Sequence, residues 1–310
     1  MLTVLQTALE VGLIYGLVAL ALFISFSILN IADLSTDGCF TLGCAVGAML
    51  TIAGHPILAL FAAMAAGMLS GYVTAFLQTR LGVESILAGI ISNTGLYTIN
   101  LAVMGFSSNV SITGVDTVFS LFKGLVGGQW SRLILLALIA AVIVIVLIRF
   151  FGMSLGLSIR ATGDSLDMVS ASSINPKATI TIGLCLANAL TALSGCLIGE
   201  YNKFCDINLG TGMVTIALAS LIIGEVFAGH RGGVGKRIVC VVLGSIVYRF
   251  IIALALRLNI SAEYFKLVSA VIVAVAIAAP NMKGYVRLAK IKSNARKLRA
   301  LSGKGDETDA

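Results

Sequence analysis

The side chains that could carry chemistry in this sequence are carboxylates in or beside long apolar segments. Asp33 and Asp37 lie in a short polar break after the first such segment, and Glu225 lies near the end of the seventh. An ionisable group at membrane depth is costly, so each is a functional candidate, for example as the carrier of a proton or an ion. Glu10 is close enough to the start of the first segment to be an ordinary interfacial residue.

Two of these carboxylates also have a structural interpretation. Asp33 is placed to cap a helix that begins near Gly38, and we favour this role for it. Glu225 lies only about one helical turn before Arg231, with which it could form an ion pair. The sequence leaves both interpretations open beside a role in transport.

Polar side chains also occur within the fourth apolar segment, Ile86–Met104. Asn93, Tyr97 and Asn100 are spaced by four and three residues, which places them on one face of a helix. Such a stripe either lines a passage for a solute or forms hydrogen bonds with neighbouring helices. The complete set of predicted pathway residues is Asp33, Ser35, Asn93, Tyr97, Asn100 and Glu225.

The sequence motifs of common soluble enzymes are missing. Gly235-Lys236 is followed by Arg237, so no GxxxxGK[ST] loop is present and ATP hydrolysis by the P-loop route is excluded. The two histidines, His55 and His230, form no HExxH motif and predict no metal site. GxSxG is also absent. We therefore predict no catalytic residue, no metal and no cofactor bound by this chain.

The elements that must position these residues are apolar helices. The chain of 310 residues is 58% hydrophobic and only 11% charged, whereas soluble domains have about a quarter charged residues. This composition predicts an all-α, polytopic transmembrane helix bundle. About nine membrane segments are expected, each close to the ~20 residues that a spanning helix needs. They are 8–29, 38–54, 57–78, 85–104, 131–150, 178–199, 210–229, 237–257 and 264–280.

Basic residues predict the orientation of the bundle. Residues 281–310 contain eight Lys and Arg against three Asp and Glu, so this tail carries +5 of the net charge of +7. Next to a membrane segment, such a tail indicates the cytoplasmic side and contact with anionic lipid headgroups, and we expect no nucleic acid. Counting back through nine segments places the N-terminus outside. The predicted units are a permease domain, 1–280, and a basic cytoplasmic tail, 281–310.

The longest polar stretch between apolar segments is 152–177, which must lie in water because hydrocarbon cannot satisfy its backbone and charges. Its basic residues predict the cytoplasmic side. Residues 165–173 are expected to form a short helix with Leu166 and Val169 on one face, and Pro176 is a suitable first residue for the next helix. The stretch is either a docking surface for a soluble partner or a solvated connector.

Two similar breaks suggest an internal repeat. Ile31–Gly38 follows the first segment and Asp206–Gly212 follows the sixth, and both are short and rich in Asp, Asn, Ser and Gly. Segments 1–4 and 6–9 would then be inverted repeats, as in many transporters. The alternative is two ordinary loops. Glycines at four-residue spacing predict a tightly packed bundle and nothing more specific. These pairs are Gly12/Gly16, Gly43/Gly47, Gly67/Gly71 and Gly195/Gly199.

Three stretches carry the resemblance to a known family. They are Ile31–Gly38 with its Asp-Leu-Ser element, Ile159–Asp164 followed by Ile174-Asn175 and Ser194-Gly195, and Ile216–Gly224 with Gly229–Gly233. In order and spacing they resemble the membrane subunits of bacterial ABC importers of the branched-chain amino-acid and ribose permease type. The resemblance covers about residues 8–280.

The chain departs from this family pattern at two positions. Ser173 stands where the family usually has Gly before Ile-Asn, and Glu225 stands where a second Gly is common. Residues 86–105 resemble a narrower subgroup associated with uptake of tryptophan or tyrosine. The resemblance therefore implies an amino acid, with an aromatic one favoured, as the solute.

The resemblance also implies how the chain would work. The 152–177 loop would be a coupling helix that docks on a separate ABC ATPase subunit, through Arg160, Gly163, Asp164, Asp167 and Asn175. That subunit would bind ATP and Mg²⁺, and its motion would rock the bundle between outward-open and inward-open states. An extracytoplasmic solute-binding protein would deliver the solute to a permease homodimer in the bacterial plasma membrane.

Two other functions compete with this one. An ion- or proton-coupled secondary transporter would use Asp33, Asp37 or Glu225 as its carboxylate. An intramembrane enzyme would need a nucleophile and base pair or a metal cluster inside the bundle, and the sequence provides neither.

Overall fold

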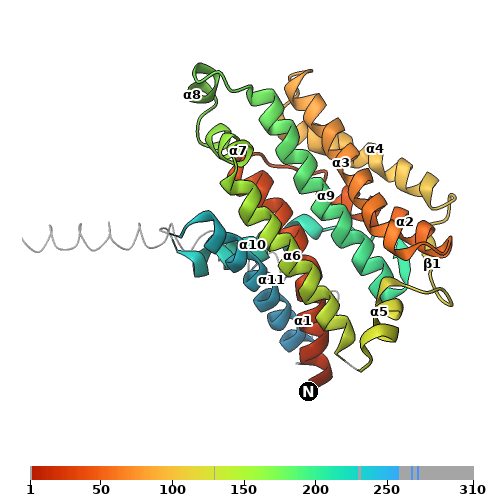
Figure 1. Cartoon of the computed structure of the whole chain (residues 1–310). Coiled ribbons are helices and arrows are strands. Elements are labelled where there is room, and N and C mark those ends of the chain that lie inside the picture. Colours follow the sequence, from red (N-terminus) through yellow and green to blue (C-terminus); the bar gives the residue numbers. More distant parts are fainter. Residues whose placement is uncertain (1, 129, 230–231, 258–266, 268–270, 272–310) are drawn as a thin grey trace, which may run out of the picture.

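The computed structural model describes residues 2–128, 130–229 and 232–257, together with Leu267 and Val271. In these residues the chain is a bundle of helices with a two-stranded sheet near one end (Figure 1). The predicted all-α membrane fold is confirmed for this part of the chain. Almost all of the ninth predicted segment, 264–280, and the whole basic tail lie outside the described residues.

Six of the described helices are long and apolar enough to cross a membrane, and two apolar helices are shorter. In chain order these eight match the first eight predicted segments. The number nine is not confirmed, because α2 and α10 are short and the last segment is not described. The long helices are α1 (Leu2–Leu22), continued by the π-helix η1 (Phe23–Ile28), α3 (Pro56–Thr79), α4 (Ser85–Val103), α6 (Ser131–Gly152), α9 (Pro176–Asn202) and α11 (Val234–Arg257). The short ones are α2 (Thr36–Ile52) and α10 (Met213–Ala228).

The structure also contains a small antiparallel sheet, which the all-α prediction did not include. β1 (Asn109–Ser111) pairs with β2 (Phe204–Asp206), with Val110 opposite Cys205. Two irregular connections meet at this end of the bundle, and their backbone N–H and C=O groups bond to each other. The helix α5 (Val118–Val126) follows in the same region.

The polar stretch 152–177 contains two helices where the sequence predicted one. They are α7 (Ser154–Asp164) and α8 (Leu166–Ala171), and the second corresponds to the helix expected at 165–173. Pro176 is the first residue of α9, as predicted. α7 was not predictable from the sequence, because its Ser, Gly and Thr residues are weak helix formers and the helix is stabilised by packing on the bundle.

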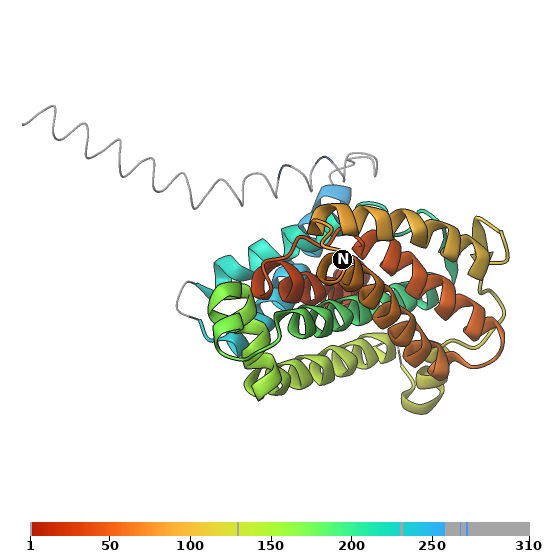
Figure 2. The ribbon, with the colours of Figure 1, turned by 90° about the horizontal axis from the view of Figure 1, so that it is seen from above.

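The helices α1 and α9 form the centre of the bundle and run in opposite directions (Figures 1 and 2). α2 and α3 pack on α9, whereas α10 and α11 pack on α1. Within each of these two pairs the helices also pack on each other. Each half of the chain thus covers the central helix of the other half, an arrangement expected of the predicted repeat of segments 1–4 and 6–9.

Glycines bring the helix backbones into direct contact. A Cβ atom added at Gly43 of α2 would lie 1.9 Å from the carbonyl oxygen of Ala192 in α9, and one at Gly195 would lie 1.9 Å from the carbonyl oxygen of Phe40. All four pairs that the sequence singled out lie at such helix contacts. Gly12 and Gly16 of α1 face α11, Gly43 and Gly47 of α2 face α9, Gly67 and Gly71 of α3 face α9, and Gly195 and Gly199 of α9 face α2.

The two ends of the bundle carry different elements. The N-terminus, the sheet and α5 lie at one end, and α7 and α8 lie at the other (Figure 1). This agrees with the predicted placement of the N-terminus and residues 152–177 on opposite sides of the membrane. Which of the two sides is cytoplasmic stays a prediction.

Candidate functional site

Helices α7 and α8 form an exposed cap on the bundle, which we call the coupling surface. Five large apolar side chains, on these helices and at the residue before α7, are more than half exposed: Met153, Leu155, Leu157, Leu166 and Met168. The charged and polar side chains Arg160, Asp164, Asp167 and Asn175 are exposed as well. Apolar area of this kind, mixed with charges at the end of a membrane bundle, is typical of a surface that another protein covers.

One expectation about this surface is wrong. Leu166 is exposed while Val169 is almost completely buried, so the two do not share an apolar face. The short α8 packs on α9 with one side only, and Val169 occupies that side. Leu166 lies at the first residue of α8 and is left on the outside.

The inner side of α7 is fixed to the bundle. Ile159 is fully buried, and the hydroxyl groups of Thr162 and Thr179 are hydrogen-bonded at 2.8 Å. A Cβ atom at Gly163 would lie 1.8 Å from the carbonyl oxygen of Ile28, the last residue of η1. Gly163, which was predicted in the docking set with Arg160 and Asp164, therefore lies against the bundle.

The connection from α8 to α9 explains one departure from the family pattern. Ser173 has a φ of 59°, in the left-handed region that glycine adopts without strain. This is the position at which the family usually has Gly. Asn175 follows and caps α9, because its Oδ1 accepts a hydrogen bond of 3.0 Å from the backbone N–H of Lys177.

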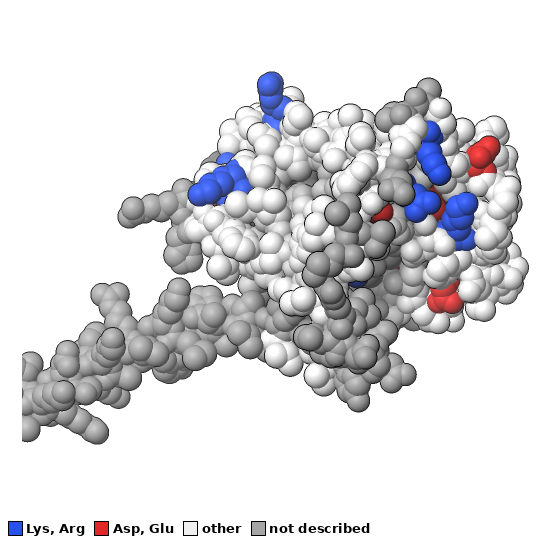
Figure 3. Space-filling view, turned by 90° about the horizontal axis from the view of Figure 1, so that it is seen from below, with Lys and Arg blue, Asp and Glu red and all other residues white. Residues whose placement is uncertain are grey.

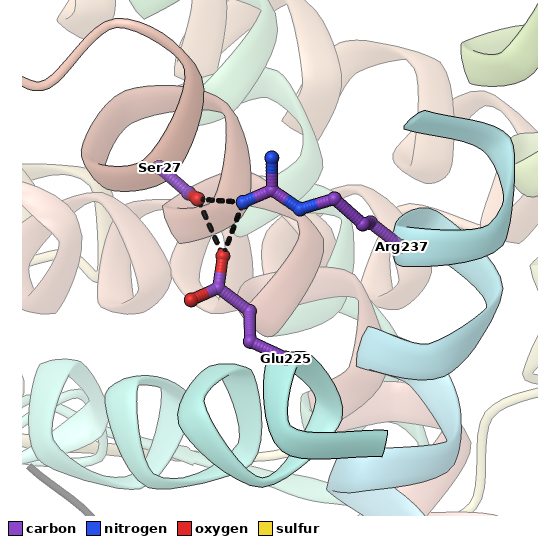
Figure 4. Close-up of polar contacts among 3 residues, drawn as sticks. All are labelled: Ser27, Glu225 and Arg237. Atoms are coloured by element: carbon purple, nitrogen blue, oxygen red, sulfur yellow. Dashed lines mark hydrogen bonds and ion pairs between the residues drawn. The ribbon is translucent and has the colours of Figure 1, made fainter. Parts of the chain in front are cut away.

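Ser27 of η1, which precedes the Ile28 that contacts Gly163, forms a polar cluster with Glu225 and Arg237 (Figure 4). Nη2 of Arg237 donates to Oε1 of Glu225 and to Oγ of Ser27, both at 2.6 Å, and Ser27 donates to the same carboxylate oxygen. The ring centre of Phe23 lies 5.1 Å from the guanidinium carbon. The cluster joins η1, α10 and α11.

Among the described residues, Glu225 pairs with Arg237. The pairing with Arg231 that the sequence suggested falls on a residue outside the described part of the chain. Pairing with a group on the following helix brings the carboxylate toward η1. One series of contacts therefore connects α7 to α10 and α11: Gly163 to Ile28, η1, and then the cluster.

Replacing Glu225 with glutamine is expected to lower the free energy of unfolding. A hydrogen bond to a charged group contributes about 1.5–3 kcal/mol, and the lower end of this range applies because both side chains are about one-third exposed. The change is measured by unfolding the purified protein in mixed detergent. The control is Glu84→Gln, at an exposed carboxylate that makes no capping bond at the start of α4. A double-mutant cycle with Arg237→Gln that gives a coupling energy below about 0.5 kcal/mol would contradict the prediction.

The predicted pathway residues Asp33 and Ser35 are buried inside the bundle. Oδ1 of Asp33 accepts hydrogen bonds from the backbone N–H and the hydroxyl of Ser35, at 2.8 and 2.6 Å. Its Oδ2 accepts one of 2.9 Å from Nδ2 of Asn188 in α9. Ser35 directly precedes α2, so these bonds hold the approach to that helix, but Asp33 accepts no hydrogen bond from an N–H group of α2 itself. Asn188 was missed, although an amide in the middle of an apolar segment is a visible signal.

Asp37 caps a helix from the other half of the chain. Its two carboxylate oxygens accept hydrogen bonds of 2.9 Å from the backbone N–H groups of Gly212 and Val214, at the start of α10. Negative charge at a helix N-terminus is favourable because it complements the helix dipole. The two breaks that the sequence paired as counterparts are therefore in contact with each other.

The polar residues of α4 divide between two environments. Asn100 is buried and donates from Nδ2 to the carbonyl oxygen of Gly38 at 3.0 Å, and Asn93 also lies against Gly38. Tyr97 is half exposed, so it does not share this packed face as the spacing predicted. Thr94 and Thr98 are exposed too. One side of α4 binds α2, and another carries hydroxyl groups on the outside of the bundle.

Glu200 is a second functional candidate, beside Asn188, that the sequence did not indicate, because it follows directly after the predicted segment 178–199. It is buried at the end of α9, where it accepts hydrogen bonds from the hydroxyl of Thr51 at 3.0 Å and from the backbone N–H of Val118 at 2.8 Å. This one carboxylate fixes the end of α2 and the start of α5.

The carboxylates proposed for ion coupling all have fixed partners. Asp33 bonds to Ser35 and Asn188, Asp37 bonds to the start of α10, and Glu225 pairs with Arg237. No group of three or more His, Cys, Asp or Glu that could hold a metal ion occurs in the part of the chain that the structure describes.

Comparison with known proteins identifies what the chain is similar to. The family described as "Branched-chain amino acid transport system / permease component" matches residues 4–277. A tyrosine transport system permease protein of Clostridioides difficile is 32% identical over 272 residues, which is 87% of this chain and 89% of that one. The uncharacterized protein RP368 of Rickettsia prowazekii is 31% identical over 277 residues, or 88% and 96% of the two chains. No solved structure shows significant similarity to the chain.

Proposed function

Because the chain belongs to the family of branched-chain amino acid transport system permease components, we propose that it is the membrane-spanning subunit of an ATP-driven importer. The family is one of transport permeases, and the several apolar helices make the chain a multi-pass membrane protein. In our proposal a separate ABC ATPase subunit binds ATP and Mg²⁺. The permease converts the motion of that subunit into alternating access.

The observation that carries this proposal is the coupling surface. Four large apolar side chains on α7 and α8, together with Met153 just before α7, are exposed next to Arg160, Asp164 and Asp167. A merely solvated connector needs no such apolar area, whereas a surface that docks into a cleft of a soluble subunit does. This favours docking over the solvated connector that the sequence also allowed.

The contacts behind this surface supply a mechanism. When the ATPase moves α7, the backbone contact between Gly163 and Ile28 transmits that movement to η1. The cluster of Ser27, Glu225 and Arg237 then transmits it to α10 and α11. A π-helix such as η1 interrupts the regular α-helical bonding and is frequent at functional sites, which suits a segment that must change shape.

We propose an amino acid as the solute, with tyrosine or tryptophan favoured. The relative of known role is described as a tyrosine transport permease. The exposed hydroxyl groups of Tyr97 and Thr98 on α4 suit the wall of a water-filled passage, whereas the hydroxyl of Thr94 donates to the carbonyl oxygen of Ile90 in the same helix. Such a passage would lie between two copies of the chain, which is why we propose a homodimer. Asn93 and Asn100 would hold α4 against α2.

The remaining parts of the system follow from the importer function. An extracytoplasmic solute-binding protein would deliver the solute at the end that carries α5 and the sheet. The ATPase would bind at the opposite end, which is then cytoplasmic. The complex would lie in the bacterial plasma membrane, among lipids, with no nucleic acid bound.

Affinity purification of the tagged chain from its native membrane, followed by mass spectrometry, tests the proposal. We expect a P-loop ATPase and a solute-binding protein to be recovered with it. The charge-reversed variant Arg160→Glu/Asp164→Arg should lose the ATPase, whereas Arg80→Glu, at an exposed position outside the coupling surface, should retain it. Retention of the ATPase by the charge-reversed variant would refute the docking role. Uptake by the chain alone under an ion gradient, without ATP, would favour a secondary transporter.

A further inference from the structure

A polar cavity of about 270 Å³ lies at the end of the bundle that carries the N-terminus, where α1, α5, α6 and α9 meet. Its side chains include Gln6, Glu10, Lys123, Ser131, Arg132 and Tyr201. Figure 3 views this end of the molecule and shows basic and acidic side chains next to one another on the right of the face. The cavity is far from the coupling surface, and neither the sequence motifs nor the transport mechanism above makes use of it.

The base of the cavity is a buried carboxylate. Glu10 is only 3% exposed, and its two oxygens accept hydrogen bonds from Nε2 of Gln6 at 2.9 Å and from the hydroxyl of Tyr201 at 2.8 Å. These two donors fix its orientation. Each carboxylate oxygen has lone pairs for a further donor, so Glu10 can accept from an ammonium group that enters the cavity.

The opening of the cavity carries two cations. Lys123 and Arg132 are exposed, and neither lies within ion-pair distance of a carboxylate in the described residues. The guanidinium carbon of Arg132 is 5.8 Å from the centre of the Tyr201 ring. Two cations outside and one carboxylate inside favour a ligand with an anionic group and an ammonium group, in that order from the opening inward.

The position of the cavity indicates that this ligand is a lipid headgroup. Trp130, which is nearly half exposed, directly precedes the cavity residues Ser131 and Arg132, and tryptophan is enriched at the depth of the headgroups. An apolar groove of about 320 Å³ adjoins the cavity and shares Thr7 with it. Val4, Val11 and Ile252 of α1 and α11 line this groove, which can take an acyl chain. Arg249 also borders the groove, with its guanidinium stacked on the ring of Tyr15.

We propose that this cavity binds the headgroup of a phosphatidylethanolamine-type lipid. Lys123 and Arg132 hold the phosphate, Glu10 accepts from the primary ammonium, and an acyl chain lies in the groove between α1 and α11. A phosphatidylglycerol headgroup has no ammonium for Glu10, and the quaternary ammonium of phosphatidylcholine has no N–H to donate. The site therefore selects phosphatidylethanolamine over both. It is independent of the proposed transport function.

Native mass spectrometry of the purified full chain with short-chain phospholipids tests the site. We expect dihexanoyl phosphatidylethanolamine to bind at least about tenfold more tightly than the phosphatidylcholine and phosphatidylglycerol analogues. Lys123→Gln/Arg132→Gln should lower its affinity at least about tenfold, whereas Lys203→Gln, an exposed cation at the same end, should not. Glu10→Gln, which keeps the shape of the side chain, should remove the preference for the ethanolamine headgroup.

The proposal is overturned by equal binding of the three lipids by the wild type, by unchanged binding by the Lys123→Gln/Arg132→Gln variant, or by an unchanged lipid preference in Glu10→Gln. Free phosphoethanolamine and tyrosine serve as soluble zwitterions in competition. If either displaces the lipid at equal concentration, the ligand is a soluble zwitterion and the assignment to lipid is wrong.

Discussion

Replacing Gly163 with valine is expected to reduce solute uptake at least about tenfold while the bundle stays folded. The new Cβ atom would lie 1.8 Å from the carbonyl oxygen of Ile28, so α7 must move away from η1. Overpacking of this kind costs about 1–3 kcal/mol. A cost of about 1.4 kcal/mol lowers the equilibrium constant for α7 in its native position against η1 tenfold. Because α7 is the only link that we propose between the ATPase and η1, uptake suffers more than folding does.

Uptake of labelled tyrosine and ATP hydrolysis are measured together in vesicles that contain the whole complex. In Gly163→Val we expect hydrolysis to continue without uptake. The control is Gly152→Val at the end of α6, where an added side chain meets open space. Uptake by Gly163→Val within about twofold of the control would exclude transmission through this contact, since it leaves less than about 0.4 kcal/mol for the effect.

Replacing Gly43 with alanine is expected to lower the stability of the whole bundle. The added methyl group would lie 1.9 Å from the carbonyl oxygen of Ala192, an atom of the α9 backbone that cannot rotate away. The helices α2 and α9 must separate, which costs about 1–3 kcal/mol for the overpacking alone and more where neighbouring glycine contacts open as well. The free energy of unfolding in mixed detergent measures the loss.

Gly95 of α4 provides the matched control for this experiment. It is also a helical glycine, but an added Cβ atom meets nothing within 4 Å. Gly95→Ala should be neutral or stabilising by about 0.5–1 kcal/mol, because alanine loses less backbone entropy on forming a helix. Equal stability of Gly43→Ala and Gly95→Ala would show that the close approach of α2 and α9 does not limit the fold.

The kind of fold could be predicted from the sequence because membrane helices are local structures. A segment in hydrocarbon must satisfy its own backbone hydrogen bonds, so an apolar run of sufficient length becomes a helix whatever surrounds it. The predicted ranges 57–78, 85–104 and 131–150 accordingly agree with α3, α4 and α6, with ends that differ by no more than about two residues. The start of α9 at Pro176 is local for the same reason, since proline suits the first turn of a helix.

The candidate site was only partly predictable. Arg160, Asp164 and Asp167 were named from local motifs, and they are exposed as a docking surface requires. Gly163 belongs to the same motif but lies on the inner side of α7, against Ile28. Sequence spacing gives the order of these residues. It does not say which side of a short amphipathic helix faces the bundle, because that depends on what the bundle offers for packing.

The class of the protein, a polytopic helical membrane protein with two polar breaks and one long polar loop, follows from the sequence alone. The partners of its carboxylates follow only from helix packing: Arg237 and Ser27 for Glu225, the start of α10 for Asp37, and Asn188 for Asp33. Ser27 and Arg237 are separated by 210 positions in the chain. Helix formation depends on neighbours within a few residues, whereas these contacts exist only after α1, α9, α10 and α11 have packed together.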